Sequence, residues 1–272
     1  MRIVRTVNSR TPLLPWKPLA AETVGTALLV AVGLSIVILD FGRGSPMVRL
    51  LPDDGARRAL TGFLFGTTGA LIALSPLGKA SGAHINPAVT FAFWLMGRMQ
   101  RCHALGYVLC QLSGALLGAL PLLLWGAMGA STSYGATVPG RETGNGLALL
   151  GETATTFALI FGLFVFLRHR TLRQFTPALF PPLYAIMVWL EAPISGTSTN
   201  PARSLGPAAI SGVWNGWWIY WLGPMAGTLL AVAAYRFAGW ERHRIRVAKV
   251  FHFAHDPYGI FHVPMQKSGM TS

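Results

Sequence analysis

Two copies of the tripeptide Asn-Pro-Ala are the residues of this sequence whose types and order could do chemistry. They are Asn86-Pro87-Ala88 and Asn200-Pro201-Ala202. Asn is a favoured helix N-cap, and Pro fits the first helical turn because its missing N–H is not needed there. Each tripeptide therefore predicts a helix start, and a helix N-terminus carries partial positive charge. Two such ends that face each other would repel cations, while the Asn amides could donate hydrogen bonds to a neutral polar solute.

Four further side chains suit either a pore or a proton pathway. Glu22 and Glu152 lie inside apolar stretches, where an acid is costly unless it is paired or hydrogen-bonded. In a transporter they could relay protons. His84 precedes Asn86 by two residues, and a lone His could act as a pH switch. Arg203 directly follows the second tripeptide, and its permanently charged guanidinium would donate hydrogen bonds and repel cations.

The composition places these residues in a membrane. Of the 272 residues, 52% are hydrophobic and 11% are charged, whereas soluble domains have roughly 25% charged residues. This excludes an ordinary soluble enzyme and a disordered chain. The net charge of +13 first suggests nucleic acid, but the cationic residues sit at the ends of apolar segments, so no nucleic-acid partner is expected. Cys102 and Cys110 form no disulfide framework and no metal-ligand spacing, and no metal or cofactor is expected.

Six long apolar stretches predict six membrane spans, because a span needs about 20 residues. They run near 18–40, 59–77, 104–128, 146–167, 176–194 and 215–237. Two shorter stretches, 86–96 and 200–210, begin at the two Asn-Pro pairs and are too short to cross. Each is expected to enter the membrane and return, which is allowed only where the backbone is buried or lines a wet cavity. The predicted fold class is an all-α membrane protein with six transmembrane helices and two re-entrant half-helices.

The two halves of the chain share a series of landmarks in the same order. The matched pairs are Glu22 with Glu152, Ser81 with Ser195, Asn86 with Asn200, Tyr107 with Tyr220, and Gly114 with Gly227. Each half holds three predicted spans, an odd number, so the halves cross the membrane in opposite directions and form an inverted 3+3 repeat. The two Asn-Pro-Ala segments then enter from opposite faces and meet near the midplane, which implies a pore or a binding site there.

Lys and Arg residues predict the orientation, because short cytoplasmic loops carry an excess of them. Most lie on the side that holds both termini, so both termini are expected to be cytoplasmic. We expect a basic N-terminus at 1–17, a six-span domain at 18–238 and a basic, polar tail at 239–272; the repeats cover about 18–128 and 146–238. The tail is expected to be solvated, and the alternative is that it lies along an anionic membrane surface. A helical bundle of this kind is expected in an inner or plasma membrane.

The two Asn-Pro-Ala regions resemble the signature loops of the aquaporin, or major intrinsic protein, family. The matching segments read S-G-A-H-I-N-P-A-V-T and N-P-A-R-S-L-G-P-A, and the resemblance covers about residues 18–238. It implies a channel domain with one pore per subunit and a homotetramer. It also implies that Glu22, Glu152 and His84 support the re-entrant loops rather than relay protons.

Members of this family narrow the pore outside the midplane with four residues at set distances from the two signature Asn residues. The resemblance assigns this selectivity filter to Gly66, Val188, Thr197 and Arg203. Arg203 matches the family pattern, whereas Gly66 and Val188 stand where strict water channels have an aromatic residue and a His. Their small size implies a wide filter, as in the plant intrinsic-protein and bacterial metalloid-permeable branches. A register shift of one residue in the second span puts Phe65 in place of Gly66.

Other positions resemble the water-channel side of the family: Ser204, Ala208 and the pair Tyr220-Trp221. The expected function is a passive channel that conducts water and small uncharged solutes and excludes protons and ions. The alternative is a broad-filter facilitator of glycerol or of metalloid acids such as arsenite, with water as a minor permeant. Glu191, one turn beyond Val188, either adds negative potential to the outer mouth or faces a subunit contact.

Two other classes of membrane protein fit the sequence less well than a channel does. A secondary transporter also uses inverted repeats and broken helices, but it needs a coupling-ion site, and no Asp or Glu adjoins either Asn-Pro-Ala. A membrane enzyme needs a nucleophile with a base or a metal cluster, and neither H-E-x-x-H nor G-x-S-x-G occurs. The sequence therefore predicts a channel rather than an enzyme, with the lipid bilayer, water and small neutral solutes as its partners.

Overall fold

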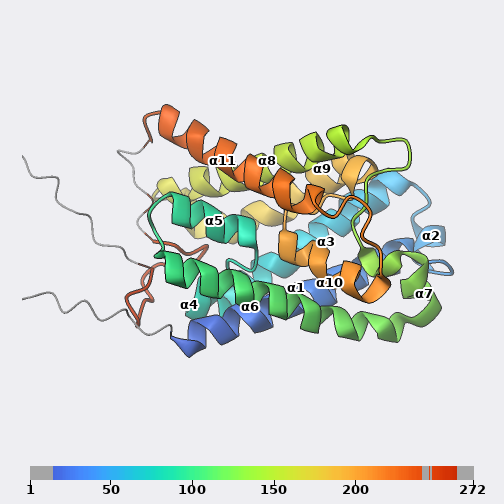
Figure 1. The fold of residues 1–272 in the computed structure, drawn as a ribbon, viewed down its shortest axis with the longest axis horizontal. Coiled ribbons are helices and arrows are strands. Elements are labelled where there is room, and N and C mark those ends of the chain that lie inside the picture. Colours follow the sequence, from blue (N-terminus) through green and yellow to red (C-terminus); the bar gives the residue numbers. More distant parts are fainter. Residues whose placement is uncertain (1–14, 241–244, 246, 262–272) are drawn as a thin grey trace, which may run out of the picture.

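The computed structural model describes residues 15–240, 245 and 247–261. The predicted basic N-terminus up to residue 14, and residues 241–244, 246 and 262–272 of the predicted tail, lie outside the described residues. Over the described part the regular secondary structure is entirely helical. Figure 1 shows the long helices side by side, running along the long axis of the molecule.

Six long helices correspond to the six predicted spans. They are α1 (Trp16–Phe41), α3 (Asp54–Leu74), α6 (Arg101–Ala119), α8 (Asn145–Arg168), α9 (Thr176–Ser195) and α11 (Ile219–Phe237). Within the described residues, four helical segments are long and apolar enough to cross a membrane by length and composition: Trp16–Phe41, Arg101–Ser131, Asn145–Arg168 and Leu172–Ser195. The other two helices, α3 and α11, have 21 and 19 residues.

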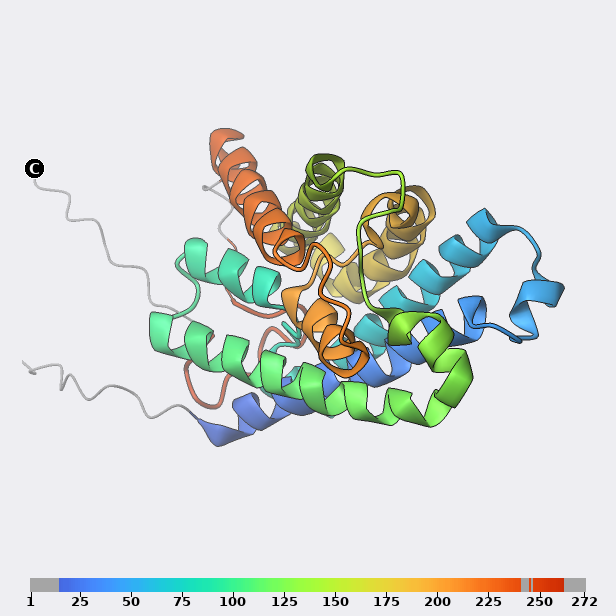
Figure 2. The same cartoon turned by 45° about the vertical axis from the view of Figure 1, so that its right-hand side comes forward.

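Two short helices begin at the two Asn-Pro pairs, as the sequence predicts: α5 (Pro87–Leu95) and α10 (Pro201–Ser211). The side chain of Asn86 accepts a hydrogen bond from the N–H of Ala88 at 2.8 Å, and that of Asn200 accepts one from the N–H of Ala202 at 3.1 Å. Figures 1 and 2 show α5 and α10 between the long helices, with their ends approaching each other near the centre of the molecule.

Two local features differ from the prediction. The third apolar stretch is not one regular helix, because α6 ends at Ala119 and continues as the 3-10 helix η1 (Leu120–Trp125) and then α7 (Gly126–Ser131). Pro121 lies in η1 and cannot donate the backbone hydrogen bond that a regular helix needs. A short helix, α4 (Pro76–Ser81), precedes the first re-entrant loop and is capped by Ser75, which accepts from the N–H of Leu77 at 3.2 Å.

Three short elements lie in the connections: α2 (Met47–Leu50), η2 (Ser133–Gly135) and η3 (Leu172–Phe175).

The matched glycines of the predicted repeat lie at equivalent helix crossings. A Cβ on Gly114 would come within 2.3 Å of the Thr23 carbonyl oxygen, and one on Gly227 within 2.4 Å of the Thr153 carbonyl oxygen. Gly therefore lets α6 approach α1, and α11 approach α8, through the same close backbone contact.

The distribution of side chains is the reverse of that in a soluble protein. Large apolar side chains are exposed on the outer faces of the long helices, among them Leu71, Leu105, Leu117, Leu150 and Leu190. Polar and acidic side chains are fully buried between the helices, among them Glu22, Thr26, Gln111, Glu152 and Thr228. Such an arrangement suits a bundle whose outer surface faces lipid.

The tail departs from the expectation that residues 239–272 are solvated. Residues 247–261 fold back onto the helices, and Ala248, Val250 and Phe261 are buried there. The physical reason is apolar burial, since these side chains join the same core cluster as Phe93 and Tyr107. The expectation is therefore wrong for this part of the tail.

Candidate functional site: two adjacent cavities

Glu22 holds the first re-entrant loop. Its buried carboxylate accepts hydrogen bonds from the backbone N–H of His84 at 3.0 Å and of Ile85 at 2.7 Å, and from the side-chain amide of Gln111 at 2.7 Å. Ala83 and Ile85 have φ values of 55° and 42°, in the left-handed region that residues other than Gly rarely adopt. The carboxylate thus fixes a strained loop that could not pair its N–H groups within a helix.

Glu152 does the same in the second loop. It accepts hydrogen bonds from the backbone N–H of Ser198 at 2.6 Å and of Thr199 at 2.8 Å, and from the hydroxyl of Ser195 at 2.6 Å. Thr197 and Thr199 have φ values of 51° and 53°. Both acids are therefore occupied as acceptors for loop backbone, which is the supporting arrangement that the resemblance implies.

The tyrosines of the repeat tie the loops to neighbouring helices. The Tyr107 hydroxyl donates to the carbonyl of Ser81 at 2.8 Å, and the Tyr220 hydroxyl donates to the carbonyl of Ser195 at 2.7 Å. The landmarks found in the sequence are thus the residues that hold the two loops, in matched pairs.

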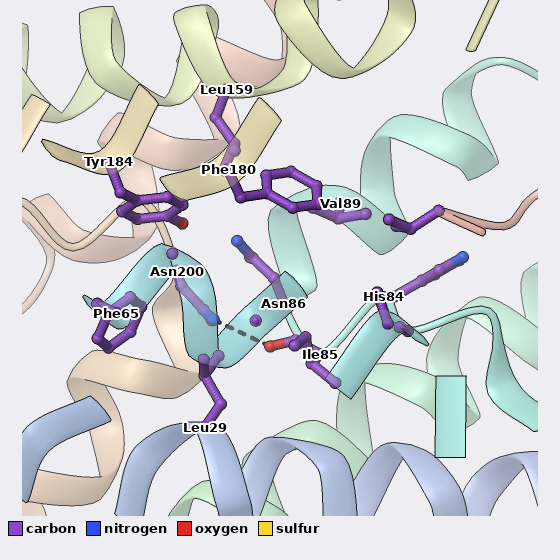
Figure 3. A pocket seen from close by; sticks show the side chains of 15 residues that line it. Leu29, Phe65, His84, Ile85, Asn86, Val89, Leu159, Phe180, Tyr184 and Asn200 are labelled. Atoms are coloured by element: carbon purple, nitrogen blue, oxygen red, sulfur yellow. Dashed lines mark hydrogen bonds between the residues drawn. The ribbon is translucent and has the colours of Figure 1, made fainter. Parts of the chain in front are cut away.

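Asn86 and Asn200 meet at the centre of the molecule (Figure 3). The amide nitrogen of Asn86 donates to the carbonyl of Thr199 at 2.9 Å, and that of Asn200 donates to the carbonyl of Ile85 at 2.9 Å. The oxygen of each side chain is occupied as the cap of its own half-helix. A side-chain amide nitrogen carries two hydrogens, so each Asn keeps one for a solute. The pair consequently offers donors, not acceptors, to whatever lies between them.

A cavity of about 50 Å³, which we call the central chamber, is lined by both Asn side chains. This volume has room for more than one water molecule. Most of its remaining wall is apolar and includes Leu29, Val89, Leu159 and Phe180. Figure 3 shows Phe65 and Tyr184 at one end of the chamber, His84 at the other, and the two Asn residues between them.

His84 is a buried lining residue of the central chamber. One ring nitrogen, Nδ1, lies 3.1 Å from the hydroxyl of Thr90, and the other, Nε2, lies 2.9 Å from the carbonyl oxygen of Ala248. A carbonyl can only accept, so Nε2 carries the hydrogen and Nδ1 can accept from Thr90. The ring also stacks on Phe93, with 4.8 Å between the centroids. Both nitrogens of a neutral imidazole are thereby satisfied.

A larger cavity of about 240 Å³, which we call the vestibule, lies beyond Phe65 and Tyr184. Val188, Thr197 and Arg203, three of the four residues that the resemblance assigns to the filter, line it together. The guanidinium of Arg203 is buried and donates to the carbonyl of Gly135 at 2.7 Å. The vestibule therefore has a fixed cation, an apolar side chain and a polar side chain on its wall.

The structure corrects the position of Gly66. A Cβ on Gly66 would lie 2.5 Å from the Phe180 carbonyl oxygen, so Gly66 is a close contact between α3 and α9. It lines the central chamber but not the vestibule. Phe65 lines both cavities instead, and its ring centre lies 6.0 Å from the guanidinium carbon of Arg203. The register that put Gly66 beside Arg203 is wrong by one residue, and an aromatic ring stands where the wide filter was expected.

Glu191 does not face a subunit contact, the second of the two roles expected for it. Its side chain is buried, its carboxylate accepts a hydrogen bond from the hydroxyl of Thr197, and it packs against Gly151 of α8. It therefore lies behind the vestibule wall, inside one subunit, where it holds Thr197.

Tyr184 and Val250 are among the lining residues that the sequence analysis did not single out. Tyr184 lines both cavities and precedes Val188 by one helical turn, a spacing that puts both on one face of α9. That spacing could have revealed it. Val250 lines the central chamber from the tail, where no motif or periodicity marked it.

One family of known proteins matches this chain. The family model described as "Major intrinsic protein" matches residues 9–235. Aquaporin-4 of Mus musculus is 32% identical over 82% of this chain and 67% of its own length. The lens fiber major intrinsic protein of Gallus gallus is 32% identical over 84% of both chains. Aquaporin A of Dictyostelium discoideum is 33% identical over 85% of this chain and 81% of its own.

A solved structure has the same fold. The X-ray structure of the aquaglyceroporin from Plasmodium falciparum superposes with a TM-score of 0.64 and 20% sequence identity, covering 81% of this chain and 95% of that one. This likeness concerns the all-helical architecture.

Proposed function

This chain belongs to the major intrinsic protein family of membrane channels, and we propose that it conducts water and small uncharged solutes passively while excluding protons and ions. The observation that carries the proposal is the reciprocal pair of hydrogen bonds between Asn86 and Asn200 and the opposite loops. It leaves two amide donors facing one chamber between two helix N-termini. A neutral solute that accepts hydrogen bonds is stabilised there, whereas a cation meets two positive helix ends.

We assign the selectivity filter to Phe65, Val188, Thr197 and Arg203. Arg203 is a cation at every physiological pH, and it lies beside the route from the vestibule to the central chamber. A proton or metal cation is repelled by this charge before it reaches the Asn pair. The filter thus adds a second barrier to ions, independent of the helix dipoles.

Water is the permeant that this filter favours over glycerol and metalloid acids. The broad-filter alternative depended on a Gly at the position beside Arg203, and Phe65 occupies that position. Val188 still leaves one wall apolar, so the second candidate function, a facilitator of larger neutral solutes, is the alternative outcome of the experiment below.

We further propose that the channel domain runs from about 18 to 238 and assembles as a homotetramer in an inner or plasma membrane. Exposed apolar side chains on the outer helix faces support burial in lipid or against other subunits. The excess of Lys and Arg on the side of both termini supports a cytoplasmic location for both.

Stopped-flow light scattering on purified protein in liposomes tests the proposal. An inward sucrose gradient should shrink the proteoliposomes several times faster than protein-free liposomes. A proton gradient should decay no faster in the proteoliposomes than in the protein-free liposomes. Gradients of glycerol, urea and neutral arsenite then rank the solutes. Rapid re-swelling in glycerol or arsenite would favour the broad-filter function, and ion conduction would contradict the channel proposed here.

A further inference from the structure

Two aromatic rings stand between the central chamber and the vestibule. Phe65 and Tyr184 each line both cavities. Their ring centroids lie 5.5 Å apart with an angle of 41° between the planes, and both side chains are buried. A solute that moves between the cavities must therefore pass this ring pair, which adds Tyr184 to the four residues of the filter.

Tyr184 is held in place by the second re-entrant loop. Its hydroxyl lies 2.9 Å from the hydroxyl of Thr199. Thr199 is itself fixed on both sides, because its N–H donates to Glu152 and its carbonyl accepts from Asn86. The ring is consequently tied to the same network that positions the Asn pair, and its burial against Phe65 holds it in place as well.

We propose that Tyr184 sets the upper size of the permeant, so that water passes between the cavities and glycerol-sized solutes do not. This inference rests on the proposed channel function and deepens it by naming water as the substrate. The face of a ring supplies neither donors nor acceptors to the several hydroxyls of a polyol, which must give up their hydrogen bonds to pass. A single water molecule is small enough to keep its hydrogen bonds with the Asn donors and with the neighbouring water molecules as it passes.

The test compares Tyr184→Val with Tyr184→Phe in liposomes and measures the ratio of glycerol to water permeability. The Val variant removes the ring and should raise the ratio about tenfold or more. The Phe variant keeps the ring and should leave the ratio within about twofold of the unchanged protein. Trp189→Val is the matched control, because this side chain lies on the same helix but is 51% exposed on its outer face.

An unchanged ratio in a folded, water-conducting Tyr184→Val protein would overturn the proposal. A rise in Tyr184→Phe as large as that in the Val variant would also overturn it, because the hydroxyl and not the ring would then limit size. An absence of water conduction in every protein, the shortened chain described below included, would contradict the proposed channel function instead.

A second, independent observation concerns residues 247–261, which we call the C-terminal cap. Figure 1 shows this segment, at the red end of the colour scale, beside α4. Its backbone is tied to the first re-entrant loop, since the N–H of Val250 donates to the carbonyl of Gly82 at 2.9 Å and Nε2 of His84 donates to the carbonyl of Ala248 at 2.9 Å. The Val250 side chain lines the central chamber at the end that holds His84.

Lys249 fastens the cap from inside. Its side chain is fully buried, and its ammonium donates to the carbonyls of Lys79 and His255, both at 2.7 Å. Asp256 orders the far end of the cap by accepting from the N–H groups of Ile260 at 3.0 Å and Phe261 at 3.1 Å. The cap is thus an ordered segment that is held by its own hydrogen bonds.

We propose that the C-terminal cap is an autoinhibitory plug that covers the end of the pore opposite the vestibule and must undock for full conduction. Val250 lines the chamber from the cap, and the bonds to Gly82 and His84 connect the plug to the loop that carries Asn86. The cap is held by these hydrogen bonds and by the burial of Ala248, Val250 and Phe261. None of these ties is a hydrogen bond within a helix, so the cap can undock while the helices stay folded.

Two variants test the plug. Lys249→Met removes the ammonium that fastens the cap, and a chain ending at Trp240 removes the cap completely while it keeps α11. Both should raise water permeability per molecule several-fold, and Lys249→Met should also speed hydrogen exchange in residues 247–261. Tyr258→Ala is the matched control, because Tyr258 lies in the cap and is 42% exposed.

If hydrogen exchange in residues 247–261 becomes faster in Lys249→Met but water permeability does not rise, the plug proposal is overturned. Equal permeability of the full and shortened chains, both conducting water, would also overturn it and leave the channel function standing. If the shortened chain fails to fold, the point variant and its exchange rates still decide the question.

Discussion

Thr197 donates its hydroxyl hydrogen to the buried carboxylate of Glu191, six residues earlier in the chain. Thr197 lies in the second re-entrant loop with a φ of 51°, so this bond holds the side chain of a strained residue against the vestibule wall. The second oxygen of Glu191 is buried without a hydrogen-bond partner among the described residues. Glu191 is therefore a positioning residue whose effect on the pore acts through Thr197.

Replacement of Glu191 separates its hydrogen bond from its charge. Glu191→Gln keeps an oxygen that can accept from Thr197, so we expect solute selectivity close to that of the unchanged protein. Glu191→Leu removes the acceptor, frees Thr197 and should change the ratio of urea to water permeability by about fivefold, in line with the loss of one hydrogen bond of about 1 kcal/mol. If the Gln variant behaves like the Leu variant, the charge and not the bond is what matters.

Arg203→Val should weaken the exclusion of cations. The guanidinium is the fixed charge beside Phe65 and the vestibule, and its loss lowers the barrier that a proton or Na⁺ meets. We expect proton flux to rise about tenfold or more, which corresponds to about 1.4 kcal/mol of barrier. A pH-sensitive dye inside liposomes measures this. Unchanged proton exclusion would show that Arg203 does not lie at the constriction.

Glu152→Gln should impair stability more than selectivity. A Gln side chain has only one acceptor oxygen, so the N–H of Ser198 or of Thr199 is left unpaired in the protein interior. The expected loss is about 1–3 kcal/mol, seen as lower thermal stability in detergent. Glu22→Gln is the matched variant in the other half and should behave alike. A change in the pH dependence of transport at unchanged stability would instead indicate a proton relay.

Gly66→Ala should destabilise the protein, because the new methyl group would lie 2.5 Å from the Phe180 carbonyl oxygen, which is backbone and cannot move aside cheaply. We expect a loss of about 1–3 kcal/mol from overpacking. Gly69→Ala, three residues further along the same helix, is the control, because its nearest neighbour would lie 3.9 Å away. Thermal unfolding of the two variants compares them. Equal stability would mean that Gly66 is not the close contact.

The cap should dock more firmly as pH rises above about 8. Burial lowers the pKa of Lys249 from 10.5 to about 8, an effect that Asp256 opposes and Lys79 reinforces. His252 and His255 are the other titratable groups nearby. A neutral Lys249 amine still has two hydrogens for the carbonyls of Lys79 and His255, so loss of the proton removes the cost of burying a charge and keeps both bonds. The docked state holds the proton less tightly than the released state, so docking gains stability between about pH 8 and 10.5 and water permeability should fall. A Lys249→Met protein should show no such fall in the same liposome assay.

The sequence by itself determined the helices and the two loops. Apolar stretches of the right length set the spans, and Asn followed by Pro set the starts of α5 and α10, because capping is a local property of a few residues. The repeat also singled out Glu22 and Glu152, whose partners follow from the matched loops. These features depend on neighbours in the chain or on a pattern that occurs twice.

Only the tertiary structure decided which side chains face the pore. Successive helix residues point about 100° apart, so a one-residue error in register exchanged Phe65 for Gly66. The role of Val250 arises because the C-terminal cap packs against a loop that is far away in the sequence. Contacts of that kind leave no periodic signal, since they depend on how whole elements fit together.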